Sequence, residues 1–237
     1  MRFWVDNLVA GYGRIEVVHG VSLEVPEGDR VGLFGPNGHG KTTLLRAISG
    51  LIERRGGAIH FGDMDLTGAS SSGMVEEGVI QVPQGSALFP RMTVLEALTL
   101  GAYAGRAWDQ RRRSLDEVLT IFPRLAERRS QRCSTLSGGE RQMAAIGIGL
   151  MGSPRLLILD EPTLGLAPRI RSELAQAIQA IAETGVSLIA VDQDIEMLFG
   201  LCSRLYFIEQ GRVTLKVTDR SEVRHQEVLK RYFGSAA

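Results

Sequence analysis

A glycine-rich segment between an apolar run and a helical run is the feature that most restricts the fold of this chain. The segment reads GPNGHGKTT, Gly35–Thr43, and fits the pattern G-x-x-x-x-G-K-[ST]. The apolar run Arg30–Phe34 precedes it and predicts a buried strand, and Thr42–Ser49, closed by Gly50, predicts a helix. A strand, a phosphate loop and a helix in this order favour an α/β core that binds a nucleoside triphosphate over a chance glycine-rich turn.

The residue types of this loop suit a triphosphate with its metal ion. Glycines let backbone N–H groups surround the phosphates, and the start of the following helix adds its dipole. We expect Lys41 to neutralise the β- and γ-phosphates and the Thr42 hydroxyl to ligate Mg²⁺. The predicted ATP-binding residues of the loop are Gly35, Pro36, Asn37, Gly38, His39, Gly40, Lys41, Thr42 and Thr43.

Two adjacent carboxylates follow a second apolar strand. The run LLILD ends in Asp160, and Glu161 comes next. Because side chains alternate along a strand, the two carboxylates should point in different directions. Asp160 can then reach the Mg²⁺ shell beside Thr42, while Glu161 acts as general base on the attacking water. The alternative is a solvated acidic turn before Pro162.

A third glycine motif, LSGGERQ, Leu136–Gln142, begins another predicted helix. Ser137 and Glu140 fit the S-x-x-E pattern of a capping box, which could explain them without any ligand. Gly138 and Gly139, however, each cost the first turn up to about 1 kcal/mol against alanine. We therefore expect something to approach this backbone closely, and an anion is the natural candidate at a helix start.

Strands and helices alternate at both ends of the chain, which predicts an α/β core, and the pattern between residues 86 and 150 is helical, which indicates an inserted arm. The other predicted strands are Phe3–Leu8, Val21–Val25, Ala58–Phe61, Val79–Val82, Ser187–Val191 and Leu205–Ile208. The other predicted helices are Val94–Tyr103, Leu115–Phe122, Gly138–Leu150, the stripe of Ile170, Leu174, Ala177, Ile178 and Ile181, then Asp194–Leu201 and Ser221–Phe233.

With the phosphate loop, LSGGERQ and LLILDEP in this order, the chain resembles the nucleotide-binding subunits of ABC transporters over nearly its whole length. The resemblance implies one P-loop NTPase domain over residues 1–237, with an antiparallel β part at its N-terminus. The ATP-binding core would take residues 1–85 and 151–237, and the helical subdomain residues 86–150. It also implies a head-to-tail dimer, as a homodimer or with a second ABC ATPase. Each ATP would lie between the phosphate loop of one subunit and Ser137, Gly138 and Gly139 of the other.

The resemblance assigns roles to three further positions. Tyr12 would stack on adenine, unless it is an ordinary turn tyrosine. Gln84 would join the core to the arm and sense the metal and the water, unless it is a solvated loop amide. Gln193 stands where the family usually has a switch histidine; its amide can donate to a γ-phosphate but cannot carry a proton charge, and we expect it to be a working residue.

Two other positions depart from the family. Ala167 replaces the usual aspartate, which should weaken communication across the dimer. His39 replaces a small residue, and we expect its side chain to face solvent rather than take part in catalysis.

Finer matches point to one branch of the family. GSALFPRMTVLEALTLGAY, FPRLAERR, LSGGERQMAAIGIGLM and EPTLGLAP are similar to the ATP-binding subunits of branched-chain amino acid importers, a branch that also serves urea, amides and other small solutes. The implied function is ATP hydrolysis that powers uptake through separate permease subunits, supplied by a periplasmic or surface solute-binding protein. The alternatives are a soluble ABC ATPase of translation or DNA repair, and a regulator without turnover. The single core and the intact Glu161 argue against both.

Composition limits the partners and the location. The 27 Lys and Arg balance the 27 Asp and Glu, so no global field favours nucleic acid. The two cysteines form no disulfide framework, and neither a membrane span nor a secretory signal is evident. We expect a peripheral protein on the cytoplasmic face of the inner (plasma) membrane.

A membrane partner would dock on an apolar cluster with an arginine, unless these residues only pack the arm. The cluster consists of Leu88, Phe89, Pro90, Arg91 and Met92. The run Arg111–Arg113 is expected to be a solvated helix face.

Overall fold

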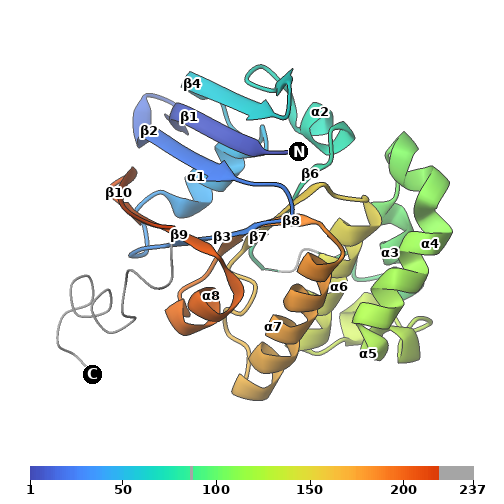
Figure 1. Cartoon of the computed structure of the whole chain (residues 1–237). Coiled ribbons are helices and arrows are strands. Elements are labelled where there is room, and N and C mark those ends of the chain that lie inside the picture. The colour runs from blue at the N-terminus through green and yellow to red at the C-terminus, as the bar shows by residue number, and fades with distance from the viewer. Residues whose placement is uncertain (86–87, 219–237) are drawn as a thin grey trace.

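Two sheets and an arm of helices make up the computed structural model, which describes residues 1–85 and 88–218 (Figure 1). The six-stranded core sheet has the order β10 (Arg212–Val217), β9 (Arg204–Glu209), β3 (Arg30–Phe34), β8 (Ser187–Val191), β7 (Leu156–Asp160), β6 (Val79–Val82). Neighbouring strands from β9 to β6 are parallel, and β10 is antiparallel to β9. The predicted helix Ser221–Phe233 lies outside the described residues.

The central strands are apolar throughout because both faces of the sheet are covered. Every residue of β7 and β8 is buried. Leu157 and Leu159 face a hydrophobic core shared with α6 (Gly138–Met151) and α7 (Pro168–Glu183). Leu156 and Ile158 face a second core, shared with α1 (Lys41–Ile48). Because these strands are parallel, their carboxyl ends meet at one edge of the sheet, and the loops of the candidate site follow from that edge.

An antiparallel sheet covers α1 from the other side, in the order β2 (Ile15–Val25), β1 (Phe3–Tyr12), β4 (Arg54–Phe61), β5 (Met64–Asp65) (Figure 1). The predicted antiparallel β part is therefore confirmed. Its strands are longer than predicted, because a tight turn through Gly13, with φ of 55°, joins β1 directly to β2.

The arm contains α3 (Val94–Gly101), α4 (Gly105–Ile121), α5 (Pro123–Glu127) and the N-terminal part of α6. The prediction Leu115–Phe122 covers only the second half of α4. The first half buries Ala107 and Ser114 but has no apolar stripe for a periodicity argument to detect. The elements α2 (Ser71–Glu76), α5, β5 and β10 were also not predicted, and α8 (Ile195–Leu201) agrees with its prediction.

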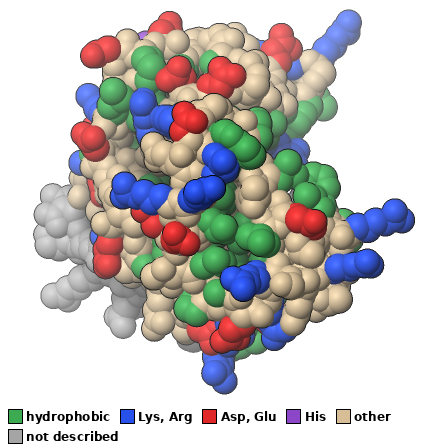
Figure 2. Space-filling model, turned by 90° about the vertical axis from the view of Figure 1, so that its right-hand side faces the viewer, with side chains coloured by type: hydrophobic (Ala, Val, Ile, Leu, Met, Phe, Trp, Pro, Cys, Tyr) green, Lys and Arg blue, Asp and Glu red, His purple; other side chains and the backbone are tan. Residues whose placement is uncertain are grey.

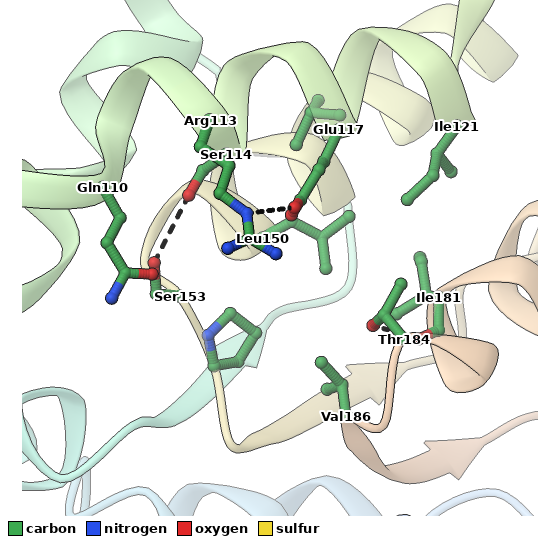
Figure 3. Close-up of a pocket in the computed structure, with 12 residues that line it drawn as sticks. Gln110, Arg113, Ser114, Glu117, Ile121, Leu150, Ser153, Ile181, Thr184 and Val186 are labelled. Atoms are coloured by element: carbon green, nitrogen blue, oxygen red, sulfur yellow. Dashed lines mark hydrogen bonds and ion pairs between the residues drawn. The ribbon is translucent and has the colours of Figure 1, made fainter.

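The arm and the core sheet share one hydrophobic core, in which Leu98, Val118 and Met143 of the arm join Leu157 and Leu188. The subdomain boundaries at 86 and 150 remain a prediction. A cavity of about 290 Å³ lies where α4 meets the loop before β7 and the end of α7 (Figure 3). The hydroxyls of Ser114 and Ser153 lie 3.4 Å apart at its edge.

The outer side of the arm carries exposed apolar side chains among charged ones (Figure 2). They include Leu95, Leu100, Tyr103 and Trp108 on α3, α4 and the turn between them. Trp108 stacks under the Arg111 guanidinium, 4.1 Å from the ring centre, and Arg113 pairs with Glu117. The solvated basic helix face expected at 111–113 agrees with these contacts. Among residues 1–85 and 88–218, none of the helices has the length and apolar character of a bilayer span.

Candidate nucleotide site

The candidate site lies at the carboxyl ends of the parallel strands β3, β7 and β8, where ligands of open α/β sheets bind. Three loops meet there: the one after β3 carries the glycine motif, the one after β7 carries Glu161, and the one after β8 carries Gln193. They surround a cavity of about 510 Å³. Its lining consists of Asn37, Gly38, Gly40, Lys41, Thr42, Thr43, Gln84, Glu161, Leu164 and Gln193.

Glycine is required at two positions of the phosphate loop by the backbone itself. Gly35 has φ of 148°, and a Cβ there would lie 2.1 Å from the carbonyl oxygen of Ile208. Gly40 has φ of 97° and is the N-cap of α1, with no side chain capping the helix. The first N–H groups of α1 are therefore available to a ligand, as a phosphate site needs.

Lys41 is held inside the loop that it belongs to. It is 4% exposed, and its Nζ donates to the carbonyl oxygens of Gly35 at 2.7 Å and Pro36 at 2.9 Å. Burial lowers the pKa of Lys41, while the nearby carboxylates Glu161 and Asp160 oppose that shift. To neutralise phosphate oxygens, Lys41 must exchange these carbonyl partners for the ligand.

Asp160 and Thr42 meet as predicted. The Thr42 hydroxyl donates to Asp160 Oδ1 at 3.3 Å, and Asp160 is 2% exposed. Burial raises the pKa of Asp160, and the bond from Thr42 partly offsets that shift. A hydroxyl and a carboxylate are hard oxygen ligands that fit Mg²⁺, which usually takes only one or two protein ligands beside substrate phosphates. Within the described residues, no cluster of three or more His, Cys, Asp and Glu forms a separate metal cage.

Glu161 bonds two glutamines, whereas Asp160 bonds Thr42. Its Oε2 accepts from Gln84 Nε2 at 3.0 Å and from Gln193 Nε2 at 3.1 Å. Glu161 itself is half-buried, with φ of 48°, and its N–H donates to the carbonyl oxygen of Val191 at 2.8 Å. The three side chains predicted to act in catalysis thus meet at one carboxylate oxygen beside the phosphate loop.

Tyr12 and His39 are not among the residues that line the cavity, and each contacts another part of the chain. The Tyr12 hydroxyl accepts from Arg46 Nη1 at 3.2 Å, and the ring is 42% exposed, which leaves a face for an aromatic ligand. His39 Nδ1 accepts from the N–H of Gln210 at 3.2 Å, and its carbonyl oxygen accepts from Gly211 at 3.0 Å. The expectation that the His39 side chain simply faces solvent misses this link to the β9–β10 turn.

The LSGGERQ motif begins α6 with the predicted capping box. Ser137 Oγ accepts from the Glu140 N–H at 3.4 Å, and Glu140 Oε2 accepts from the Ser137 N–H at 2.9 Å. Burial alone would raise the pKa of Glu140, but the bonds from Ser137 and the Arg128 guanidinium together hold it below its usual range. These residues do not line the cavity of their own chain.

The two glycines of this motif have different reasons to be glycine. A Cβ at Gly139 would lie 2.5 Å from Ile170 Cγ2, so packing against α7 explains Gly139 without a ligand. A Cβ at Gly138 would meet nothing nearer than Arg141 Nη2 at 3.9 Å. The glycine residue type therefore points to a ligand only at Gly138, and the part of Gly139 in ligand binding stays a prediction.

The predicted docking residues divide into two groups. Leu88 packs against the larger hydrophobic core, which favours the local-packing alternative for that residue. The carbonyl oxygens of Pro90 and Met92 accept from Ser134 and Cys133, and so tie the segment to the chain before α6. Phe89 is 58% exposed and remains free to meet a partner.

Sequence reasoning missed two buried residues beside the site, Thr163 and Asp192. Each is 3% exposed, and the Thr163 hydroxyl donates to Asp192 Oδ2 at 2.7 Å. The sequence signal was present in AVDQD, where a carboxylate directly after a fully buried strand precedes Gln193. Ala167, which replaces the usual aspartate of the family, is the N-cap residue of α7 and makes no side-chain hydrogen bond to that helix.

The strand, phosphate loop and helix, together with an aspartate and a glutamate after a neighbouring parallel strand, define a P-loop nucleoside triphosphatase. The family model described as ABC transporter matches residues 18–164, more than half of the chain. The chain belongs to the ABC transporter family, as an ATP-binding subunit with an ATPase fold.

One relative shares the sequence over nearly its whole length, and two solved structures share the fold. The high-affinity branched-chain amino acid transport ATP-binding protein BraG of Pseudomonas aeruginosa is 39% identical and covers 97% of this chain and 98% of its own. The ADP conformation of MJ1267, an ATP-binding cassette of an ABC transporter, superposes with a TM-score of 0.84 at 23% identity over 99% and 100% of the two chains. The dimeric structure of MJ0796, a bacterial ABC transporter cassette, superposes with a TM-score of 0.77 at 24% identity. The match covers 91% of this chain and 97% of the MJ0796 chain.

Proposed function

We propose that this chain hydrolyses ATP at a dimer interface to power import of a branched-chain amino acid through separate permease subunits. The observation that carries the hydrolysis is the meeting of Gln84 and Gln193 at Glu161 Oε2, beside the phosphate loop. The 39% identity with BraG over nearly both chains supports the choice of solute.

The residues divide the chemical work. The loop from Gly35 to Thr43 holds the phosphates, and Lys41 neutralises them after leaving its two carbonyl partners. Thr42 and Asp160, joined by Gln84 from the cavity lining, would hold Mg²⁺, which when bound neutralises charge on the phosphate oxygens.

Hydrolysis itself falls to Glu161, which accepts the proton of the attacking water. Gln84 and Gln193 fix its carboxylate, and the second N–H of the Gln193 amide would donate to the γ-phosphate. Tyr12 provides an aromatic face for adenine.

A second subunit would complete the site with its own Ser137, Gly138 and Gly139. Within one chain these residues do not line the cavity, and Gly138 has no packing reason to be glycine. The N-terminus of α6 attracts negative charge, so it suits the γ-phosphate of an ATP held by the opposite chain. The dimeric structure described for MJ0796 supports this arrangement. The second subunit is either another copy or a paralogous ABC ATPase.

The membrane partners would bind the arm, with Phe89 as the exposed anchor. This places the chain at the cytoplasmic face of the membrane as a peripheral subunit, with a periplasmic or surface solute-binding protein acting on the far side. Nucleic acid has no part in the proposal. Phe89→Asp should release the chain from co-expressed permeases in a pull-down without lowering Tm. Leu88→Asp should lower Tm as well, because Leu88 packs on the core.

The function is tested by uptake in a strain that lacks this chain. We expect loss of leucine, isoleucine and valine uptake, restored by the wild-type chain and not by Glu161→Gln. Loss of urea or amide uptake instead would keep the importer and change the solute. A chain that remains in the supernatant, away from membranes carrying the permeases, would favour the non-transport ABC ATPase.

A further inference from the structure

A buried carboxylate that the hydrolysis steps do not use lies directly behind the candidate site. Asp192 follows the last residue of β8 and is 3% exposed. Its Oδ2 accepts from the Thr163 N–H at 3.2 Å and from the Thr163 hydroxyl at 2.7 Å, and its Oδ1 accepts from the Asp194 N–H at 2.9 Å. All three of these donors are neutral groups.

Such an arrangement needs a reason, because burying a carboxylate is costly unless hydrogen bonds compensate for lost water. An uncharged side chain would fill the same space without that cost. A hydrogen-bond acceptor at this position can instead join the loop after β7 to the loop after β8. Thr163 lies two residues after Glu161, and Asp194 lies one residue after Gln193. The two bonds from Thr163 therefore link the loop of the general base to the loop of the switch glutamine, and the bond from Asp194 braces the second of these loops on either side of Gln193.

The backbone of Glu161 shows why this link matters. A glutamate with φ of 48° is held in a conformation that costs on the order of 1–3 kcal/mol and persists only where its surroundings fix it. One restraint is the bond from the Glu161 N–H to Val191, the residue before Asp192. The second restraint, two residues further on, is the pair of bonds from Thr163 to Asp192.

We propose that Asp192 is a positioning residue that holds the Gln193 amide against the Glu161 carboxylate. The inference rests on the proposed ATPase function and adds to it a residue that never touches nucleotide. The side-chain contact that depends on this link is the 3.1 Å bond from Gln193 Nε2 to Glu161 Oε2. A small displacement of either loop breaks the bond between Gln193 and Glu161, while the phosphate loop, which leads into α1, stays in place.

Asp192→Asn tests the proposal with little change of volume. The amide keeps one acceptor and turns an NH₂ donor toward a neighbouring donor, so at least one of the three bonds is lost. We expect kcat for ATP hydrolysis to fall about tenfold, which is the effect of roughly 1.4 kcal/mol on the transition state. KM for ATP should stay within about twofold of wild type, because the phosphate contacts are unchanged.

Thr163 supplies matched variants. Thr163→Val removes the hydroxyl donor at constant shape and should lower kcat in the same way. Thr163→Ser keeps the donor and should have a kcat close to that of the wild type. Ser187→Ala is the control for a lost buried hydroxyl. Ser187 is 3% exposed at the opposite end of β8, where it bonds Gly28 and Pro26. It should lower Tm and leave kcat unchanged.

Two results separate this inference from a general loss of structure. In a Gln193→Ala background, Asp192→Asn should lower kcat no further, since its action passes through Gln193. Hydrogen exchange at the amides of Thr163 and Asp194 should be faster in Asp192→Asn, a readout that needs no ATPase activity. Wild-type kcat in Asp192→Asn, or full additivity with Gln193→Ala, or unchanged exchange, would overturn the proposal. An inactive wild-type chain whose exchange responds as expected would count against the ATPase function instead.

Discussion

The phosphate-loop half and the LSGGERQ half of the site differ in how many of their polar groups find a hydrogen-bond partner within the chain. In the first half, each charged group has a neutral partner within the chain: Lys41 donates to loop carbonyls, Thr42 donates to Asp160, and two glutamines donate to Glu161. In the second half, the capping box is closed, Gly138 is exposed, and a Cβ added to Gly138 would come near only Arg141 of the same helix. In the proposed mechanism, the first half therefore exchanges internal partners to bind nucleotide, whereas the second half meets the nucleotide of another subunit.

The largest effect should come from the catalytic carboxylate of the first half. Glu161→Gln keeps the size of the side chain but cannot accept the proton of water, so we expect kcat to fall by about 10²–10⁴-fold. ATP affinity, measured by isothermal titration calorimetry, should stay within about threefold of wild type. A Glu161→Gln chain that hydrolyses ATP at the normal rate would remove Glu161 from the mechanism.

The next effect should fall on binding. Lys41→Ala removes a charged donor to the phosphates, a contribution of about 1.5–3 kcal/mol, so we expect Kd for ATP to rise roughly 10- to 100-fold. Calorimetry measures this directly, and circular dichroism checks that the loop variant is folded. An unchanged Kd would contradict the assignment of the phosphate loop.

A smaller effect should separate the two glycines of the second half. Gly138→Asp places a carboxylate in the first turn of α6, which favours the helix by about 0.3–1 kcal/mol but repels an anion bound there. We expect Tm to hold or rise while kcat falls about tenfold.

Gly139→Ala is the matched control for this pair. Because its Cβ would meet Ile170, it should lower stability by about 1–3 kcal/mol. Full ATPase activity in Gly138→Asp would mean that no phosphate approaches α6.

The smallest effect concerns the stability of the nucleotide-free protein. Burial raises the pKa of Asp160, so folding favours the protonated carboxyl group. The contribution of this group to folding stability is present below the ordinary carboxyl pKa and is lost as pH rises through the folded-state pKa. Asp160→Asn removes a buried charge at pH 7 and should raise Tm by about 2–4 °C, the result of roughly 1 kcal/mol in a chain of this size. Scanning calorimetry at pH 7 and pH 4 should show the gain only at pH 7. A gain of equal size at both would contradict this sign.

Local sequence predicted the first half better than the second. The phosphate loop, Asp160 and Glu161 were found because consecutive residues define them, and the α/β fold with its antiparallel part follows from the same strands and from the family resemblance. The packing of Gly139 on Ile170, the bond from His39 to Gln210 and the link from Asp192 to Thr163 were not found. Each depends on residues 29 or more positions apart, which no local pattern reports.

The central claim is that two chains share each nucleotide, and sedimentation of the Glu161→Gln chain with Mg²⁺ and ATP tests it most directly. The chain alone has a mass of 25.8 kDa. The account predicts a species of twice that mass with ATP, formed by this chain or with its paralogous subunit, that dissociates when nucleotide is removed. A 25.8 kDa species that holds ATP at every concentration tested, with each paralogue supplied, would contradict it.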